Sequence, residues 1–172
     1  MTDTTTALAQ QGGGGRPAQQ AQPPVRLLIC AVGDEQYATD VASLRFVLPA
    51  DQIVPLAEGA YRVCAEVAFR GMRVPVIRLH DLFGVRYRGD GGVGRVLVTT
   101  AGRWPVGLLV DAVERVREVR PAAIQPIPER VTMLEGGYFR GFVVDGDRII
   151  LILAEAHLAA MDEVALFYRN AR

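Results

Sequence analysis

Residues 63–79 read VCAEVAFRGMRVPVIRL, two apolar runs on either side of a glycine. The runs Val63–Phe69 and Arg73–Leu79 are apolar and rich in β-branched residues, as buried strands are. Gly71 lies in the break between them, and glycine accepts the left-handed backbone that tight hairpin turns require. The stretch therefore predicts a β-hairpin with Arg70 beside the turn glycine.

Outward from this hairpin, short apolar runs continue in both directions. Gly102 and Gly146 fall at breaks between runs, as Gly71 does. Short strands with turns at this spacing indicate a β-sandwich or β-barrel architecture. The further predicted strands are Val25–Val32, a strand around Tyr37, Ile53–Leu56, Val93–Thr100, Trp104–Val110, Val113–Val119, Phe139–Val144 and Arg148–Leu153.

Helical patterns are few. Between Glu155 and Asn170, apolar residues recur at spacings of three and four, which predicts a C-terminal helix that packs against the strands. His80–Phe83 predicts a single helical turn that ends at Gly84.

A faint internal repeat relates the two halves of the chain. The hairpin segment Gly71–Ile77 (GMRVPVI) resembles Gly146–Ile152 (GDRIILI), 75 residues later. A period of half the chain length is expected for two similar small barrels. Two further pairs share apolar spacing, Ile53–Leu56 with Ile124–Ile127 and Val41–Val47 with Val110–Val116.

Size and charge narrow the function classes. The chain has 172 residues, 50% of them hydrophobic, with 19 basic and 19 acidic side chains. This length predicts one domain, or two small ones that share a core. A net charge of zero argues against a partner bound by bulk electrostatics, so we expect no nucleic acid binding and no direct membrane contact.

Residues 1–24 differ from the rest, because they contain Gly12–Gly15, a Gln-rich stretch and almost no large apolar residue. Such a segment cannot bury enough surface to offset its ordering entropy, so we expect a flexible tail before a folded domain at 25–172. The N-terminal segment lacks the basic stretch followed by an apolar stretch that is typical of a secretory signal peptide. No apolar run approaches the ~20 residues that span a bilayer. We therefore expect a cytoplasmic protein.

The candidate nucleophiles and metal ligands form no recognisable site. Ser43 is the only serine, and its surroundings do not resemble a nucleophile elbow. Cys30, Cys64 and His80 have no metal-ligand spacing, and both cysteines lie in strand patterns, as small core residues do. The sequence predicts no catalytic residue and no metal.

Two other patterns also favour structure over chemistry. Gly89–Gly94 fits the dinucleotide pattern G-x-G-x-x-G, but a strand pattern follows it where the pyrophosphate-binding helix should begin. We interpret it as a connection between the two barrels. Asp40 and Asp111 occur once in each repeat near strand ends, which indicates a structural role. We expect no cofactor and no enzymatic activity.

A β-rich chain with surplus apolar residues and no visible chemistry commonly works through its surface. Two stretches are candidates: Val41–Val47, which surrounds Arg45 with apolar residues, and Val67–Gly71, which holds Arg70. An arginine at a hairpin tip offers several hydrogen-bond donors in a fixed fork, which suits a protein interface. A solvated turn arginine is the alternative interpretation.

From Val25 to Arg169 the chain resembles the CheW-like chemotaxis coupling proteins. No single motif carries the resemblance, but the order and spacing of several are specific. The matching passages are GDEQY at 33–37 with Asp40 and Val41, FRG at 69–71 with VPVIRL at 74–79, VGLLVDAV at 106–113, YFRG at 138–141, and GDR at 146–148.

The resemblance implies a mainly β fold of two intertwined five-stranded SH3-like barrels, with a hydrophobic core between them and a C-terminal helix. It also implies a non-enzymatic adaptor. Such adaptors link the signalling tips of methyl-accepting chemoreceptors to the regulatory domain of the histidine kinase CheA, and so associate with membrane-bound receptor arrays through their partners.

The resemblance further implies four partner-binding residues. Arg70 matches the arginine of the family's Asn-Leu-Arg-Gly motif and Gly71 its turn glycine, while Phe69 occupies the leucine position. Leu44 matches a branched apolar position in a segment associated with partner contacts.

The chain departs from the family pattern beside this motif. Ala68 replaces the motif's asparagine, Ala65 stands where glycine is usual, and Glu66 occupies a commonly apolar position. The first change removes hydrogen-bonding capacity, and Glu66 adds charge. The coupling adaptor is the leading hypothesis. The alternative, which these departures favour over an enzyme, is an accessory scaffold that binds the kinase or another CheW-like domain without receptor coupling, or that serves a surface-motility array. An unrelated small-barrel protein that binds nucleic acid is the third hypothesis.

Overall fold

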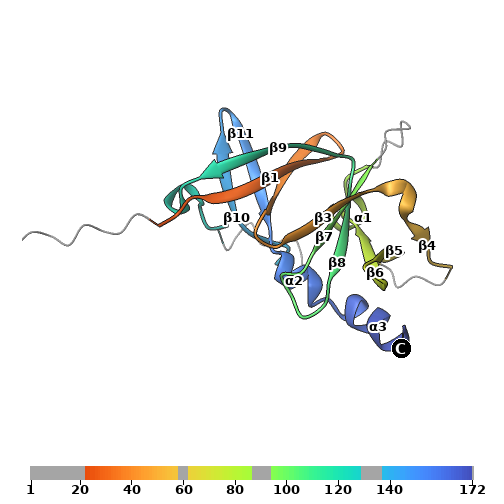
Figure 1. The fold of residues 1–172 in the computed structure, drawn as a ribbon. Coiled ribbons are helices and arrows are strands. Elements are labelled where there is room, and N and C mark those ends of the chain that lie inside the picture. The colour runs from red at the N-terminus through yellow and green to blue at the C-terminus, as the bar shows by residue number, and fades with distance from the viewer. Residues whose placement is uncertain (1–21, 58–61, 87–93, 129–136, 172) are drawn as a thin grey trace, which may run out of the picture.

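The computed structural model describes residues 22–57, 62–86, 94–128 and 137–171, and these form two β-sheets with short helices (Figure 1). The first sheet has the order β10 (Phe139–Asp145), β11 (Arg148–Leu153), β2 (Glu35–Asp40), β1 (Val25–Val32), β9 (Ala112–Val119). The second has the order β3 (Leu44–Pro49), β7 (Arg95–Thr99), β8 (Val106–Val110), β6 (Met72–Arg78), β5 (Val63–Phe69), β4 (Val54–Pro55). The helices are α1 (Leu79–Phe83), α2 (Glu155–Ala159) and α3 (Asp162–Asn170), with 3-10 turns at Ala50–Gln52 and Pro121–Ala123.

Central strands are buried on both faces, which explains their unbroken apolar runs. In β1, Leu27 and Ile29 belong to a core enclosed by the first sheet, whereas Leu28 and Cys30 belong to a larger core between the two sheets. Side chains alternate between the faces of a strand, so one apolar run can serve two cores. The second sheet encloses a third core of its own, which includes Val76.

The two sheets exchange one strand each. β2 of the first sheet leads into β3, which pairs antiparallel with β7 of the second sheet. β8 of the second sheet leads through Asp111 into β9, which pairs antiparallel with β1 of the first sheet. Each sheet thus contains an edge strand that directly follows a strand of the other sheet in the chain. The prediction of an intertwined, mainly β fold is confirmed.

Strand order also confirms the internal repeat. The series β10-β11-β2-β1-β9 corresponds to β5-β6-β8-β7-β3, and the β11–β2 and β6–β8 pairs are both parallel. The pairing of β4 with β5 has its counterpart in an isolated bridge between Gln125 and Phe142. Among the described residues, neither sheet closes into a barrel through backbone hydrogen bonds. Side chains instead join β9 to β10 and β3 to β5.

A buried carboxylate holds the chain just before the first crossover. Glu155, the first residue of α2, is 4% exposed and accepts hydrogen bonds from Thr39 Oγ1 and Asp40 N, both at 2.6 Å. Asp40 in turn accepts from Ala42 N at 2.9 Å through Oδ1, which shapes the turn into β3.

A buried histidine holds the second crossover at the equivalent place. His80 on α1 is 1% exposed, and its Nε2 lies 2.8 Å from Asp111 Oδ2, which also accepts from Gly33 N at 2.6 Å. A carboxylate only accepts, so His80 donates from Nε2. The structural role expected for Asp40 and Asp111 is thereby confirmed.

Two sequence predictions need correction. β3 was not predicted, because Leu44–Pro49 is an edge strand without alternating burial that ends in proline; pairing with β7 makes it a strand. The single C-terminal helix is two helices, since Met161 adopts an extended backbone (φ −60°, ψ 144°). This break lets both Leu158 and Val164 reach the core between the sheets.

The remaining predicted strands are present, three of them (Val25–Val32, Val63–Phe69 and Arg148–Leu153) with the predicted ends and the others with shifted ends, and α1 stops before Gly84 as expected. The predicted tail and the Gly89–Gly94 connection lie outside the described residues, apart from 22–24 and Gly94. Within the described part of the chain, no helix has the length and apolar character to cross a membrane.

We predict that Glu155→Ala lowers the free energy of unfolding by about 2 kcal/mol or more, because it leaves the Thr39 hydroxyl and the Asp40 N–H without their acceptor. Urea denaturation measures this loss. Glu118→Ala is the matched control, since Glu118 is exposed and its ion pair with Arg26, at 3.9 Å, is long and solvent-exposed. This substitution should lower the free energy of unfolding by less than about 0.5 kcal/mol. Equal stability of the two variants would remove Glu155 from this role.

Candidate functional site

The two surface stretches singled out in the sequence meet where β3 and β5, on opposite sides of the second sheet, approach each other. Phe46 on β3 and Phe69 at the end of β5 have ring centroids 5.0 Å apart in an edge-to-face arrangement. The guanidinium of Arg70 lies over both rings, 5.5 Å from each centroid. Met72, which pairs with Phe69 across the hairpin, is 48% exposed. We call Phe46, Phe69, Arg70 and Met72 the Phe46–Arg70 surface.

The hairpin turn places Arg70 at the centre of this surface. Phe69 pairs with Met72, so Arg70 and Gly71 are the two turn residues, and both have positive φ (49° and 76°). Positive φ at both positions is characteristic of the type I′ turn, which fits the twist of a hairpin. Gly71 adopts this backbone freely, and a Cβ there would meet nothing within 4 Å.

The other residues predicted to bind partners have mixed environments. Phe69 is 9% exposed and belongs to the core of the second sheet, so its ring supports the surface from below. Leu44 lies elsewhere, at the crossover, where it is half-buried against the core between the sheets. Sequence analysis missed Phe46 as an individual residue. Its signal was an aromatic side chain inside the stretch Val41–Val47.

The departures from the family motif are accommodated locally. Glu66 accepts hydrogen bonds from Arg73 Nε at 2.8 and 2.9 Å, so its charge is neutralised across the hairpin. Ala65 is buried in the core of the second sheet. Ala68 is exposed beside the turn, where it pairs with Arg73 on β6.

The equivalent strands of the first sheet, β9 and β10, contact each other through ion pairs instead of aromatic rings. Arg115 on β9 lies 2.6 Å from Asp145 on β10, and Arg117 lies 3.3 Å from the same carboxylate. Arg117 also donates to the carbonyl of Val144 at 3.2 Å. The arginines at this edge therefore have acceptors within the chain, whereas Arg70 contacts aromatic faces.

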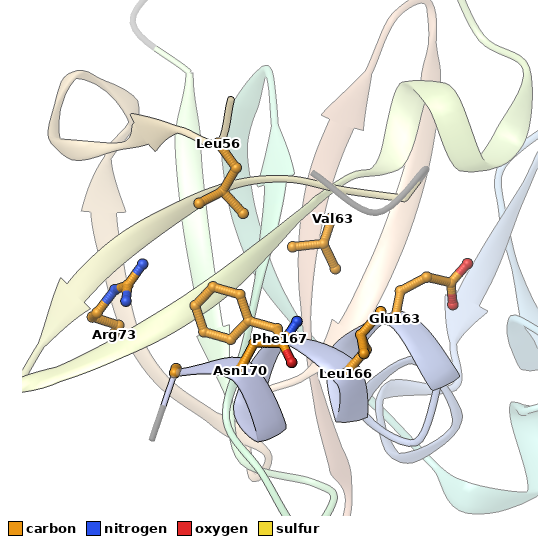
Figure 2. A pocket seen from close by; sticks show the side chains of 8 residues that line it. Leu56, Val63, Arg73, Glu163, Leu166, Phe167 and Asn170 are labelled. Carbon is orange, nitrogen blue, oxygen red and sulfur yellow. The ribbon is translucent and has the colours of Figure 1, made fainter. Parts of the chain in front are cut away.

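A small pocket separates α3 from the second sheet (Figure 2). Its volume is about 180 Å³, below the roughly 300 Å³ of the smallest typical ligand pockets. Phe167 projects from α3 between Arg73 and Val63, and the Arg73 guanidinium lies 5.6 Å from its ring centroid. Tyr168 anchors the same helix through a hydrogen bond to Pro105 O at 2.8 Å and a stack on Trp104. The pocket is therefore the space left where α3 packs against the second sheet.

Both cysteine thiols have a raised pKa, which disfavours the nucleophilic thiolate form. Burial raises the pKa of the Cys30 thiol to about 12, with a smaller contribution from the Glu114 carboxylate. Burial also raises the pKa of Cys64. Across the residues that the structure describes, no three His, Cys, Asp or Glu side chains lie close enough together to hold a metal ion.

Comparison with known proteins assigns the family. Residues 26–163 match the CheW-like domain. The chain belongs to the CheW-like family. It is similar to the chemotaxis protein CheW of Klebsiella aerogenes, with 29% identity over 142 residues, which cover 81% of this chain and 84% of that protein. The probable chemotaxis protein CheW of Rhizobium etli is 26% identical over 127 residues, 74% of this chain and 82% of its own length.

A solved structure supports the fold of this CheW-like chain. The scaffolding protein TtCheW from Thermoanaerobacter tengcongensis superposes with a TM-score of 0.73 at 23% identity, covering 87% of this chain and 96% of that protein. The likeness confirms the SH3-like architecture expected from the sequence. The CheW-like family is a family of scaffolds.

Leu44→Asp should lower the free energy of unfolding by about 2 kcal/mol or more, because it places a carboxylate against the core between the sheets. Urea denaturation followed by circular dichroism measures the change. Arg45→Asp is the neighbouring control; Arg45 is exposed, so its substitution should change stability by less than about 0.5 kcal/mol. Unchanged stability of Leu44→Asp would make Leu44 a surface residue.

Native Cys30 should resist thiol reagents at pH 8, because its raised pKa leaves very little reactive thiolate. Cys64 should react more slowly than a free cysteine, for the same reason. Colour release from Ellman's reagent, with and without denaturant, measures both. Rapid reaction of two thiols in the native chain would contradict the burial of Cys30.

Proposed function

We propose that this CheW-like chain is a non-enzymatic chemotaxis adaptor that couples methyl-accepting chemoreceptors to the histidine kinase CheA. The observation that carries the proposal is the Phe46–Arg70 surface, which lies on a domain of the CheW-like family. The adaptor would act in the cytoplasm and reach receptor arrays through its partners. Its task is to hold two proteins in fixed register, and several weak contacts in one array gain avidity.

We assign kinase binding to the Phe46–Arg70 surface. Aromatic and arginine side chains dominate the binding energy of protein interfaces, and here they lie in direct contact. Phe46 is 43% exposed and Met72 48%, so a partner would remove substantial apolar area from water. Phe69 and Gly71 would act by fixing the shape of this surface, Phe69 from the core and Gly71 in the turn.

We assign receptor binding to the crossover between the two sheets. Val41, Leu44 and Val113 are half-buried apolar residues that pack against the core between the sheets and retain some exposure. They come from both crossovers, so a receptor signalling tip bound here would contact both halves of the scaffold. Leu44 would then contribute to stability and to binding together.

The alternative is an accessory scaffold that binds the kinase, or another CheW-like domain, without a receptor, in this or a surface-motility array. The position of Ala68 favours it, since an alanine beside the turn offers no side-chain hydrogen bond. The Phe46–Arg70 surface is compatible with either role, so receptor binding decides between them.

Calorimetric titration of the full chain against the CheA regulatory domain and the receptor signalling tip of the same genome tests the proposal. We expect binding to both. Arg70→Ala should keep the fold and weaken kinase binding by about 1 kcal/mol or more, as for an interface anchor. Arg26→Ala, which removes an exposed arginine from the first sheet, should leave both affinities unchanged. Binding to the kinase alone would support the accessory scaffold, and binding to neither would refute both roles.

A further inference from the structure

Arg70 occupies a backbone position that suits other residues better. It is the only non-glycine residue with positive φ among those the structure describes. A side chain crowds the backbone in this left-handed region, and asparagine or glycine tolerates it best. The hairpin alone therefore gives no reason for arginine. Local rules are broken in this way mainly at functional positions.

The charge of Arg70 is not neutralised within the described part of the chain. Its contacts there are the faces of Phe46 and Phe69. Several other exposed arginines have carboxylate partners, such as Arg73 with Glu66 and Arg115 with Asp145. Neither ring accepts a conventional N–H···O hydrogen bond, so the N–H donors of the Arg70 guanidinium stay available to a partner.

The surroundings of Arg70 define the group that would complement it. Phe46 and Met72 are exposed and apolar, so a partner covering them would also exclude water from the guanidinium. An arginine fork matches a carboxylate with two parallel hydrogen bonds, and this pairing strengthens as water is excluded. A neutral apolar partner would instead bury the charge without a counter-ion, which is costly.

We propose that the Phe46–Arg70 surface binds an Asp or Glu carboxylate that stands among apolar residues on the kinase regulatory domain. This inference rests on the proposed function, because it takes the kinase as the partner. The aromatic rings hold the guanidinium in place, and the strained turn aims it outward. The carboxylate then sets which partner surface is accepted.

Arg70→Asn separates binding from folding, because asparagine suits the left-handed turn but lacks the guanidinium. We expect it to match or exceed the thermal stability of the parent chain and to weaken kinase binding about tenfold or more. The affinity of the parent chain should fall as salt rises from 50 mM to 500 mM, and that fall should be much smaller for Arg70→Asn. Arg26→Asn is the charge-matched control and should keep the parent's affinity and salt dependence.

Charge reversal identifies the partner group. Arg70→Glu should bind the kinase domain more weakly than Arg70→Asn, since it adds repulsion. Within a set of kinase domains that each carry one surface Asp→Lys or Glu→Lys change, one should restore binding to Arg70→Glu at least tenfold. The absence of any rescue, or an unchanged affinity of Arg70→Asn, would overturn the carboxylate proposal while leaving kinase binding established.

Two outcomes would overturn the named partner instead. If the parent chain does not bind the kinase domain at all, the proposed function fails and this inference fails with it. If sedimentation velocity shows that the parent chain self-associates and Arg70→Asn does not, the occupant is a second copy of this chain. Asp145 at the other hairpin would then be the acidic group to reverse.

Discussion

The exchange of one strand between the two sheets is the constraint on which the rest of the structure depends. β3 completes the second sheet and β9 completes the first, so neither half has a full sheet without the other. The exchange forces two crossovers, and each is held by a buried polar side chain, Glu155 or His80. It also creates the core between the sheets, since strands such as β1 must bury both faces. Both crossovers therefore tie the two sheets together, which suits the proposed task of holding two partner proteins in fixed register.

The two halves share a strand order but differ in how their open edges meet. In the first sheet, Arg115 and Arg117 pair with Asp145, and charges compensate one another. In the second sheet, Phe46 and Phe69 meet instead, and Arg70 lies across them. The repeated architecture therefore presents two different surfaces at equivalent places. Such asymmetry suits an adaptor, because a symmetric scaffold would offer the same surface to both of its partners.

The fold could be predicted from the sequence to a large extent, and the reasons are local. The unbroken apolar runs of the strands, the turn glycine Gly71 and the similarity of GMRVPVI to GDRIILI are visible in short stretches of sequence. β3 escaped prediction because an exposed edge strand has no burial pattern, and the break at Met161 escaped because packing of Leu158 and Val164 imposes it.

The residues of the candidate site could be predicted one by one from the sequence, but their contacts could not. Arg70 was visible as a hairpin residue, but its contact with Phe46 joins positions 24 residues apart, whose strands β3 and β5 are separated in the sheet by three others. Leu44 was visible as an apolar residue, yet its half-burial at the crossover depends on the strand exchange.

Coupling is the central claim, and it requires the chain to bridge two proteins, beyond binding each one. Co-sedimentation tests this directly. The CheA kinase is mixed with membranes that carry the cognate receptor, in the presence of increasing amounts of the full chain, and the kinase in the pellet is measured. The account predicts that the pelleted kinase rises with added chain and falls again at large excess, when separate copies occupy the receptor and the kinase. Kinase that stays in the supernatant at every concentration of chain would contradict it.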